Sequence, residues 1–347
     1  MTLDIEAAVL ESTGRLEIRN ISSLALERGQ ILVKILYSGV CRSQLMEVRG
    51  LRGEDPWRPH LLGHEGSGVV VEVGPEVTKV IPGDEVILTW IKSKGIEGEG
   101  AKYESDSGTI NSGRVTTFSN YSVVSESRVV KKPENLSLDS AVLYGCAIPT
   151  GAGIVINELN VDIESSVVVL GLGGVGFSAL LACRALGIQK LIAVDSSDTK
   201  LSYAKEAGVK NVINVNDDQF LEKVEKITGV DGADYCIESA GRASTIEHGF
   251  SLIRKSGGRL LFASHPPAGE MIKIDPYDLI SGKEISGSWG GDAEPDRDID
   301  IIVDLFDRAG VDLTKFITKR YRLRDVNLAL DDLEKGNVFR PLIVMEH

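Results

Sequence analysis

The sequence predicts an α/β protein that joins a doubly wound parallel sheet to a mostly β, barrel-like domain. Three observations support this fold class. The length of 347 residues suits about two domains, short apolar runs fill the first third, and strand-like runs alternate with amphipathic helices from Ser166 onward. We expect the barrel-like domain at 1–149 and 291–347, and the parallel sheet at 150–290.

Short runs rich in Val, Ile and Leu in the first third are separated by Gly, Pro and Ser, which is typical of antiparallel strands. The runs are EAAVLE, RLEIRN, QILVKILYSGV, GSGVVVEVG, DEVILTW and NYSVVSESRVVKKP. Between Trp90 and Asn120 the chain becomes polar and rich in Gly and Ser, without clear periodicity. We expect a long surface loop there.

The middle of the chain repeats a strand followed by a helix, beginning with SVVVLG and VGFSALLACRALG and ending with RLLFAS. Such repeats predict a parallel sheet with right-handed crossovers. Its helices are expected to end at Gly187, Gly208 and Gly229, because glycine accepts a positive φ. After Gly291 the pattern predicts a helix, a strand, a second helix and a final strand that pack back onto the first domain.

Composition narrows the possible environments and partners. A formal charge of −13 disfavours nucleic acid as a partner, because phosphate binding needs a clustered basic surface. No apolar run approaches the roughly 20 residues needed to span a bilayer, and the first residues do not form a signal or transit pattern. Four widely spaced cysteines make a poor disulfide framework. We expect a cytoplasmic protein that does not bind membranes.

A glycine-rich segment, GLGGVG, follows the strand-like run at 166–170 and leads into a helix. Gly171, Gly173 and Gly176 have the G-x-G-x-x-G spacing of a Rossmann dinucleotide site, and Gly174 and Val175 complete the expected turn. The alternative is a glycine-rich turn without a ligand. The strand KLIAVD that follows the next helix makes the dinucleotide site the better interpretation.

That strand ends at Asp195, whose carboxylate could accept hydrogen bonds from an adenosine ribose diol. The same charge would repel a 2′-phosphate, so the expected cofactor is NAD rather than NADP. Asp195 could instead be a helix N-cap, and both roles can coexist. Lys200 could reach the same ribose, although an exposed helical lysine explains it equally well.

Cys41, His64 and Cys146 together supply two thiols and one imidazole, the ligand types of a catalytic zinc with an open fourth position. Each cysteine taken singly would be read as a small buried residue. Cys183 and Cys236 lack such partners and are predicted to lie in the core.

The motif G-H-E-x-x-G-x5-G-x-x-V is met from Gly63 to Val77, and PGDEV follows it. Together with GVCRS, TFSNYSVV, GCAIPTG, VLGLGGVG, AVD and GNVFRPLIV, in that approximate order, this series resembles the zinc-containing alcohol dehydrogenases of the medium-chain dehydrogenase/reductase superfamily. The resemblance covers nearly the whole chain. It implies a GroES-like catalytic domain beside the Rossmann domain.

The resemblance also implies roles for individual residues. It makes Cys41, His64 and Cys146 ligands of a catalytic zinc, with Glu65 as an acid that can join the coordination sphere. It makes Ser43 the hydroxyl that bonds the substrate oxygen. The resemblance also places Arg42 and Arg340 at the cofactor pyrophosphate and Thr150 beside the nicotinamide. It places Trp90 and His265 at the substrate pocket.

The chain departs from the family in three places. No cysteine occurs between Ile91 and Asn120, so we expect no structural zinc. Gln44 stands where relatives often have an acid, and Met46 where several have the histidine that ends a proton relay. We therefore expect the relay to run from Ser43 to a cofactor ribose hydroxyl and then to water or another side chain. His265 and His60 are the histidine candidates, although structural or solvent-facing roles suit both better.

These parts predict a zinc-dependent oxidoreductase that transfers a hydride between NAD and an alcohol, polyol or sugar hydroxyl, reversibly to an aldehyde or ketone. Two alternatives stay open: a zinc-free enone or quinone reductase on the same fold, and a non-enzymatic NAD-binding sensor. The family also implies a homodimer or homotetramer.

Overall fold

The computed structural model describes residues 3–347, and the chain forms two compact units. Unit 1 contains Met1–Cys146, Glu294–Arg297 and Leu313–His347. Unit 2 contains Ala147–Ala293 and Asp298–Asp312. The chain therefore crosses between the units more than once, and the C-terminal residues belong with the N-terminal ones.

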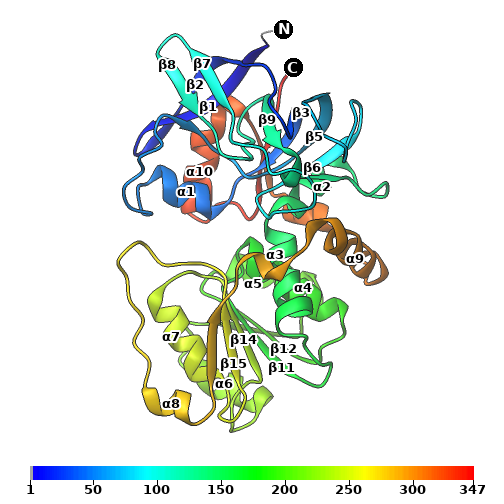
Figure 1. The fold of residues 1–347 in the computed structure, drawn as a ribbon. Helices are drawn as coiled ribbons and strands as arrows, with labels where there is room; N and C mark the ends of the chain where they lie inside the picture. Colours follow the sequence, from blue (N-terminus) through cyan, green and yellow to red (C-terminus); the bar gives the residue numbers. More distant parts are fainter. Residues whose placement is uncertain (1–2) are drawn as a thin grey trace. The chain divides into compact units, whose positions relative to one another are not determined.

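Unit 1 contains a closed barrel and a separate seven-stranded sheet (Figure 1). The barrel order is β1-β2-β7-β8-β4, and the sheet order is β10-β6-β5-β3-β18-β17, with β9 also paired to β3. The barrel strands are β1 (Asp4–Ser12), β2 (Arg15–Ser23), β4 (His60–Leu61), β7 (Lys102–Ser105) and β8 (Gly108–Asn111). The sheet strands are β3 (Gln30–Gly39), β5 (Glu65–Val73), β6 (Glu85–Thr89), β9 (Tyr121–Ser125), β10 (Val129–Lys131), β17 (Lys319–Arg322) and β18 (Pro341–Val344).

The helices of unit 1 are few and short. They are α1 (Arg42–Val48), η1 (Glu126–Arg128), α2 (Leu138–Ala141), η2 (Val142–Gly145), η5 (Leu313–Phe316), η6 (Leu323–Asp325) and α10 (Val326–Glu334). One apolar core joins side chains of both chain ends, including Ile35 of β3, Leu330 of α10 and Ile343 of β18. Since β18 pairs antiparallel with β3, the C-terminal strand is part of the same sheet.

The segment between Trp90 and Asn120 is not the surface loop that its composition suggests. It contains the hairpin β7–β8, which closes the barrel, and its side chains Tyr103 and Ile110 are fully buried. Buried Glu126 also anchors it, because this carboxylate accepts the backbone N–H of Ile96 at 2.6 Å. The prediction was wrong because only every second side chain of such short strands faces the core, so the apolar signal is weak.

Unit 2 is built on a six-stranded, fully parallel sheet in the order β13-β12-β11-β14-β15-β16. Counted from its first strand this is the order 3-2-1-4-5-6 of a dinucleotide-binding sheet. Its strands are β11 (Ser166–Leu170), β12 (Lys190–Asp195), β13 (Asn211–Asn214), β14 (Tyr235–Glu238), β15 (Arg259–Phe262) and β16 (Glu284–Gly287). Together with the barrel of unit 1, this sheet confirms the predicted fold class.

Helices cover both faces of this sheet, with α4 and α7 on opposite sides (Figure 1). The helices are α3 (Ala147–Gly153), η3 (Ile154–Glu158), α4 (Gly174–Ala185), α5 (Asp198–Glu206), α6 (Phe220–Thr228), α7 (Ala243–Leu252), α8 (Pro276–Ile280) and η4 (Gly290–Asp292). α9 (Pro295–Arg308) begins in unit 1 and continues in unit 2. Gly187, Gly208 and Gly229 follow α4, α5 and α6 with positive φ, as predicted.

Within residues 3–347 we find no single helix with the length and apolar composition of a membrane span. One bent pair of helices, Leu138–Gly145 with Ala147–Glu158, has the length and composition of a span, and nothing beyond these two properties suggests one.

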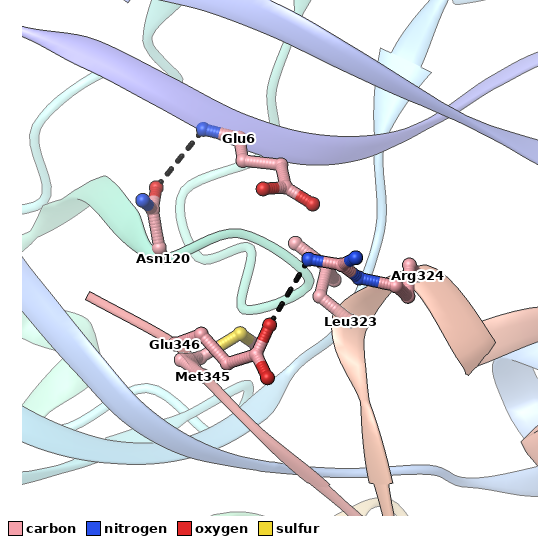
Figure 2. Close-up of a pocket in the computed structure, with 6 residues that line it drawn as sticks. All are labelled: Glu6, Asn120, Leu323, Arg324, Met345 and Glu346. Carbon is pink, nitrogen blue, oxygen red and sulfur yellow. Dashed lines mark hydrogen bonds and ion pairs between the residues drawn. The ribbon is translucent and has the colours of Figure 1, made fainter.

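A small pocket of unit 1 is lined by Glu6, Asn120, Leu323, Arg324, Met345 and Glu346 (Figure 2). Arg324 and Glu346 form an ion pair at 3.1 Å there, and none of the predicted site residues lines this pocket.

Candidate functional site

Unit 1 brings the three predicted ligands together from three distant elements. Cys41 is the N-cap residue of α1, His64 lies between β4 and β5, and Cys146 directly follows η2. One ligand atom from each residue lies within 4.8 Å of the other two. Among residues 3–347 this is the one cluster of three or more such side chains that could hold a metal ion.

A glycine stands close before each ligand and lets the backbone approach a neighbouring element. A Cβ on Gly39 would lie 2.6 Å from the Glu65 carboxylate, and one on Gly145 would lie 2.3 Å from the Leu88 carbonyl oxygen. Gly63 has φ +88, and a Cβ there would lie 2.4 Å from Thr117 Oγ1. Since real Cβ atoms do not come that close to other atoms, a larger residue at any of these positions would force the neighbouring group or the backbone beside the ligand to shift.

The pKa values of the two thiols of the cluster are shifted in opposite directions. A hydrogen bond from the Cys146 thiol holds the pKa of Cys41 well below its ordinary value, and the same pairing raises the pKa of Cys146 well above its ordinary value. By contrast, burial alone raises the pKa of the core residue Cys183 to about 12. A thiolate is the form of cysteine that binds metals, so the pair is prepared to bind a cation.

His64 supplies the observation that fits a metal most directly. Its Nε2 is buried without a hydrogen-bond partner, while its Nδ1 contacts the Gln44 side chain. Buried ring nitrogens normally have a partner, so an unpartnered nitrogen facing two thiols suits a metal ligand. Two thiolates and one imidazole are a zinc ligand set that leaves a fourth position for another group.

Gln44 connects two of the ligands and is itself 1% exposed. Its Oε1 accepts the backbone N–H of Cys41 at 2.9 Å, and its Nε2 contacts His64 Nδ1. The sequence identified Gln44 only as a departure from the family. Its contact with His64 could not be read from the sequence, because twenty residues and a strand separate the two.

Glu65 and Arg340 form a buried ion pair beside the cluster. Nη2 of Arg340 lies 2.7 Å from Oε1 and 2.8 Å from Oε2 of Glu65, which is fully buried. Burial raises the pKa of Glu65, and the facing guanidinium opposes that shift. This pairing joins residues 275 positions apart, and neither motif alone indicated it.

The other predicted residues of unit 1 lie at different depths. Arg42 is exposed and Ser43 half-buried in the first turn of α1, and Met46 is 4% exposed in the same helix. The Trp90 and His64 ring centroids are 6.4 Å apart. His60 is held by two contacts, from Nδ1 to the Leu61 carbonyl oxygen at 2.9 Å and from Nε2 to an Asp55 carboxylate oxygen at 2.8 Å.

In unit 2, each glycine of the GLGGVG loop has a distinct geometry. Gly171 has φ +86, and a Cβ on Gly176 would lie 2.0 Å from the Gly171 carbonyl oxygen, so turn and helix pack closely there. At Gly173, the N-cap of α4, no atom from other parts of the described chain lies within 4 Å of the Cβ position. A phosphate group could occupy that open space at the helix N-terminus, where Gly174 and Val175 begin α4.

Asp195, at the end of β12, is tied to the same loop. Its Oδ2 accepts the backbone N–H of Leu172 at 2.7 Å, and Lys200 Nζ lies 3.5 Å away. Its Oδ1 accepts the N–H of Ser197 at 2.9 Å, so it also shapes the turn into α5. Elsewhere in unit 2, Thr150 is buried in α3 and His265 is exposed after β15.

The remaining cysteines behave as the sequence predicts. Cys183 in α4 and Cys236 in β14 are fully buried, and neither belongs to the candidate metal cluster. Burial raises the pKa of both thiols. They are core residues.

Comparisons with known proteins agree with this geometry. Residues 27–134 match the alcohol dehydrogenase GroES-like domain, and residues 174–308 match the zinc-binding dehydrogenase domain. The S-(hydroxymethyl)glutathione dehydrogenase of Synechocystis sp. is 30% identical over 367 residues, covering 97% of this chain and 98% of the relative.

Two crystal structures are similar over nearly the whole chain. An alcohol dehydrogenase zinc-binding domain protein from Burkholderia ambifaria is 28% identical with a TM-score of 0.90, and 100% of each chain is covered. Benzyl alcohol dehydrogenase from Acinetobacter calcoaceticus is 27% identical with a TM-score of 0.86, covering 99% of this chain and 100% of that one. The chain belongs to the zinc-containing alcohol dehydrogenase family of the medium-chain dehydrogenase/reductase superfamily. It is accordingly an oxidoreductase that acts on CH–OH groups.

Proposed function

We propose that this chain oxidises an alcohol with NAD, reversibly, at a catalytic zinc held by Cys41, His64 and Cys146. The observation that carries the proposal is the convergence of three ligand atoms within 4.8 Å, one of them on an imidazole whose Nε2 has no other partner. When bound, zinc supplies Lewis acidity towards the substrate oxygen. One zinc per chain, without a structural zinc, is part of the proposal.

The side chains around the cluster would position the substrate and move its proton. Ser43, half-buried next to the ligand Cys41, is proposed to hydrogen-bond the substrate hydroxyl and take part in removing its proton. Trp90 would form one wall of the substrate site, since its ring lies close to that of His64. Glu65 is proposed to act near the metal, with its charge balanced by Arg340.

The end of the proton relay is proposed to be a cofactor ribose hydroxyl and then water. Both ring nitrogens of His60 are already engaged, and Met46 has no titratable group. His265 is exposed, with Nδ1 2.8 Å from the Pro266 carbonyl oxygen. Replacing His265 by Ala should therefore leave the pH profile of turnover unchanged, and a shifted profile would place it in the relay.

For the cofactor, we propose NAD bound by the glycine-rich loop, with Arg42 and Arg340 at its pyrophosphate and Thr150 beside its nicotinamide. The open space at Gly173 supports a bound dinucleotide, and the Asp195 carboxylate at the end of β12 favours NAD over NADP. Lys200 is proposed to share the adenosine ribose. The domain limits 1–149 with 291–347, and 150–290, remain a proposal for the functional domains. The two compact units differ from these limits, because residues 147–149, 291–293 and 298–312 belong to unit 2.

A panel of substrates together with metal analysis tests the proposal. Purified protein would be given NAD or NADP with simple alcohols, polyols, sugars, benzyl alcohol and S-(hydroxymethyl)glutathione, the last two being named for relatives. With zinc supplied in the buffer, we expect one zinc per chain and NAD reduction with at least one alcohol. Active, metal-free protein that reduces an enone or quinone would support the zinc-free alternative, and tight NAD binding without any turnover would support a sensor.

We also propose a cytoplasmic homodimer or homotetramer. The strand β16 is the edge of its sheet, and Trp289 just after it is 84% exposed. An edge strand with exposed apolar neighbours is a surface that a second copy can cover. Sedimentation analysis would show a single species of two or four chains, and a monomer at working concentration would contradict this part.

A further inference from the structure

The Gln44 side chain has a single acceptor oxygen, but it contacts two groups that can donate a hydrogen bond, the Cys41 backbone N–H and His64 Nδ1. This side chain is buried, so bulk water does not reach it. Oε1 already accepts the Cys41 backbone N–H, and the Nε2 amide group faces His64 Nδ1. An amide has one acceptor oxygen and one donor nitrogen, whereas a carboxylate has two acceptor oxygens.

A histidine that binds a metal through Nε2 carries its proton on Nδ1, because the Nε2 lone pair is used by the metal. Nδ1–H then needs an acceptor, which metal-binding histidines find in a carboxylate, a carbonyl or water. At His64 it meets the NH₂ group of Gln44. Turning the amide over places Oε1 against His64 but leaves its NH₂ group against the Cys41 N–H, so one donor faces another in both orientations.

The other tautomer satisfies both contacts of Gln44, although the proton on Nε2 then lacks a hydrogen-bond partner. With the proton on Nε2, Nδ1 accepts a hydrogen bond from Gln44 Nε2, while Oε1 keeps the Cys41 N–H. That tautomer cannot bind a metal through Nε2. Gln44 therefore stabilises the form of His64 that the metal-bound centre must give up.

We propose that Gln44 is a positioning residue that weakens metal retention at this centre, by offering His64 a donor where a metal-bound imidazole needs an acceptor. The inference rests on the proposed role of His64 as a ligand. Its consequence is an exchangeable metal, so that occupancy follows the zinc concentration around the protein.

The test compares Gln44→Glu with the wild type. Glutamate has nearly the same shape and supplies two acceptor oxygens, so zinc loss to an excess of chelator should slow by roughly 10- to 100-fold. The tautomer of His64 is read separately by ¹⁵N NMR of the metal-free proteins, labelled at their five histidines. We expect the proton on Nε2 in the wild type and on Nδ1 in Gln44→Glu.

Gln30→Glu is the matched control for the added charge. Gln30 is also buried in unit 1, accepts the Glu27 N–H at 2.8 Å and donates to the Glu99 carbonyl oxygen at 3.1 Å. It lies at the opposite end of β3, about 30 Å along the strand from the residues before Cys41. Zinc loss from Gln30→Glu should match the wild type, and thermal melting of each variant reports whether it is folded.

Three results would overturn the inference: equal zinc loss in the wild type and Gln44→Glu, equal slowing in both glutamate variants, or a wild-type His64 that already carries its proton on Nδ1 without metal. The wild-type tautomer decides the question even if Gln44→Glu does not fold. A wild type that binds no zinc would instead overturn the proposed function and its ligand set. Normal zinc binding with the unexpected tautomer would overturn this inference alone.

Discussion

The candidate metal cluster of Cys41, His64 and Cys146 and the glycine-rich loop depend on the chain in different ways. The loop occupies the consecutive residues 171–176, and its geometry follows from one strand, one turn and one helix. The cluster uses residues 41, 64 and 146, which meet only after the sheet and barrel of unit 1 have formed. The loop should therefore keep its geometry when a substitution disturbs unit 1. The cluster should lose its geometry whenever one of its three segments moves.

The largest effect is expected from removing one ligand. Cys146→Ala should abolish stoichiometric zinc binding and lower kcat/KM by roughly 10³-fold or more, because the metal supplies several kcal/mol of transition-state stabilisation. NADH binding, measured by fluorescence titration, should stay near the wild-type value because unit 2 is intact.

Cys183→Ala is the control for that variant, since Cys183 is an equally buried cysteine outside the cluster. It should keep its zinc and its activity, with a loss of about 1 kcal/mol in stability at most. Loss of NADH binding in Cys146→Ala would show that the two sites do not fail independently.

The second largest effect is expected at the buried ion pair between Glu65 and Arg340. Arg340→Met leaves Glu65 buried without its counter-charge, which should lower the free energy of unfolding by about 3 kcal/mol near neutral pH. Glu65→Gln combined with Arg340→Met should recover much of that loss. Denaturant unfolding of the single and double variants measures both, and equal losses in the two would argue against a charge effect.

The same variant should show a pH dependence with a defined sign. Burial already raises the pKa of Glu65 above its ordinary value, and removing the opposing guanidinium raises it further. A raised pKa means that stability is retained at low pH and lost as pH rises through the folded-state value. The deficit of Arg340→Met relative to the wild type should thus grow from pH 4.5 to pH 8.

A moderate effect is expected at Asp195, which is proposed to contact the adenosine ribose. Asp195→Asn keeps an acceptor oxygen but removes the charge that would repel a 2′-phosphate. The ratio of kcat/KM for NAD to that for NADP should fall by roughly 10- to 100-fold, with zinc content unchanged. An unchanged ratio would mean that Asp195 acts only in the turn, through its bonds to Leu172 and Ser197.

The smallest effects come from two identical changes inside the loop. Gly173→Ala adds a methyl group to open space, so it should weaken NADH binding by about 10-fold without changing the melting temperature. Gly176→Ala places the same group against the Gly171 carbonyl oxygen and should cost about 2 kcal/mol of stability. Similar melting temperatures for the two variants would contradict the different roles of these glycines.

The sequence alone was sufficient where neighbouring residues determine the structure. Alternating strands and helices predicted the parallel sheet, and glycine spacing predicted the loop, because strand, turn and helix signals are local. The ligand types at Cys41, His64 and Cys146 were also recognisable, but only as an ordered series of motifs that resembled a family. The same local signals failed between Trp90 and Asn120, where a hairpin of polar composition closes the barrel.

Only the tertiary structure decided which of these groups touch. It joined Arg340 to Glu65, left His64 Nε2 without a partner, and placed the Gln44 amide between two ligands. These contacts depend on how strands distant in sequence pair in the sheet of unit 1. Local propensity cannot encode them, because each contact is fixed by the packing of the whole unit rather than by the residues beside it.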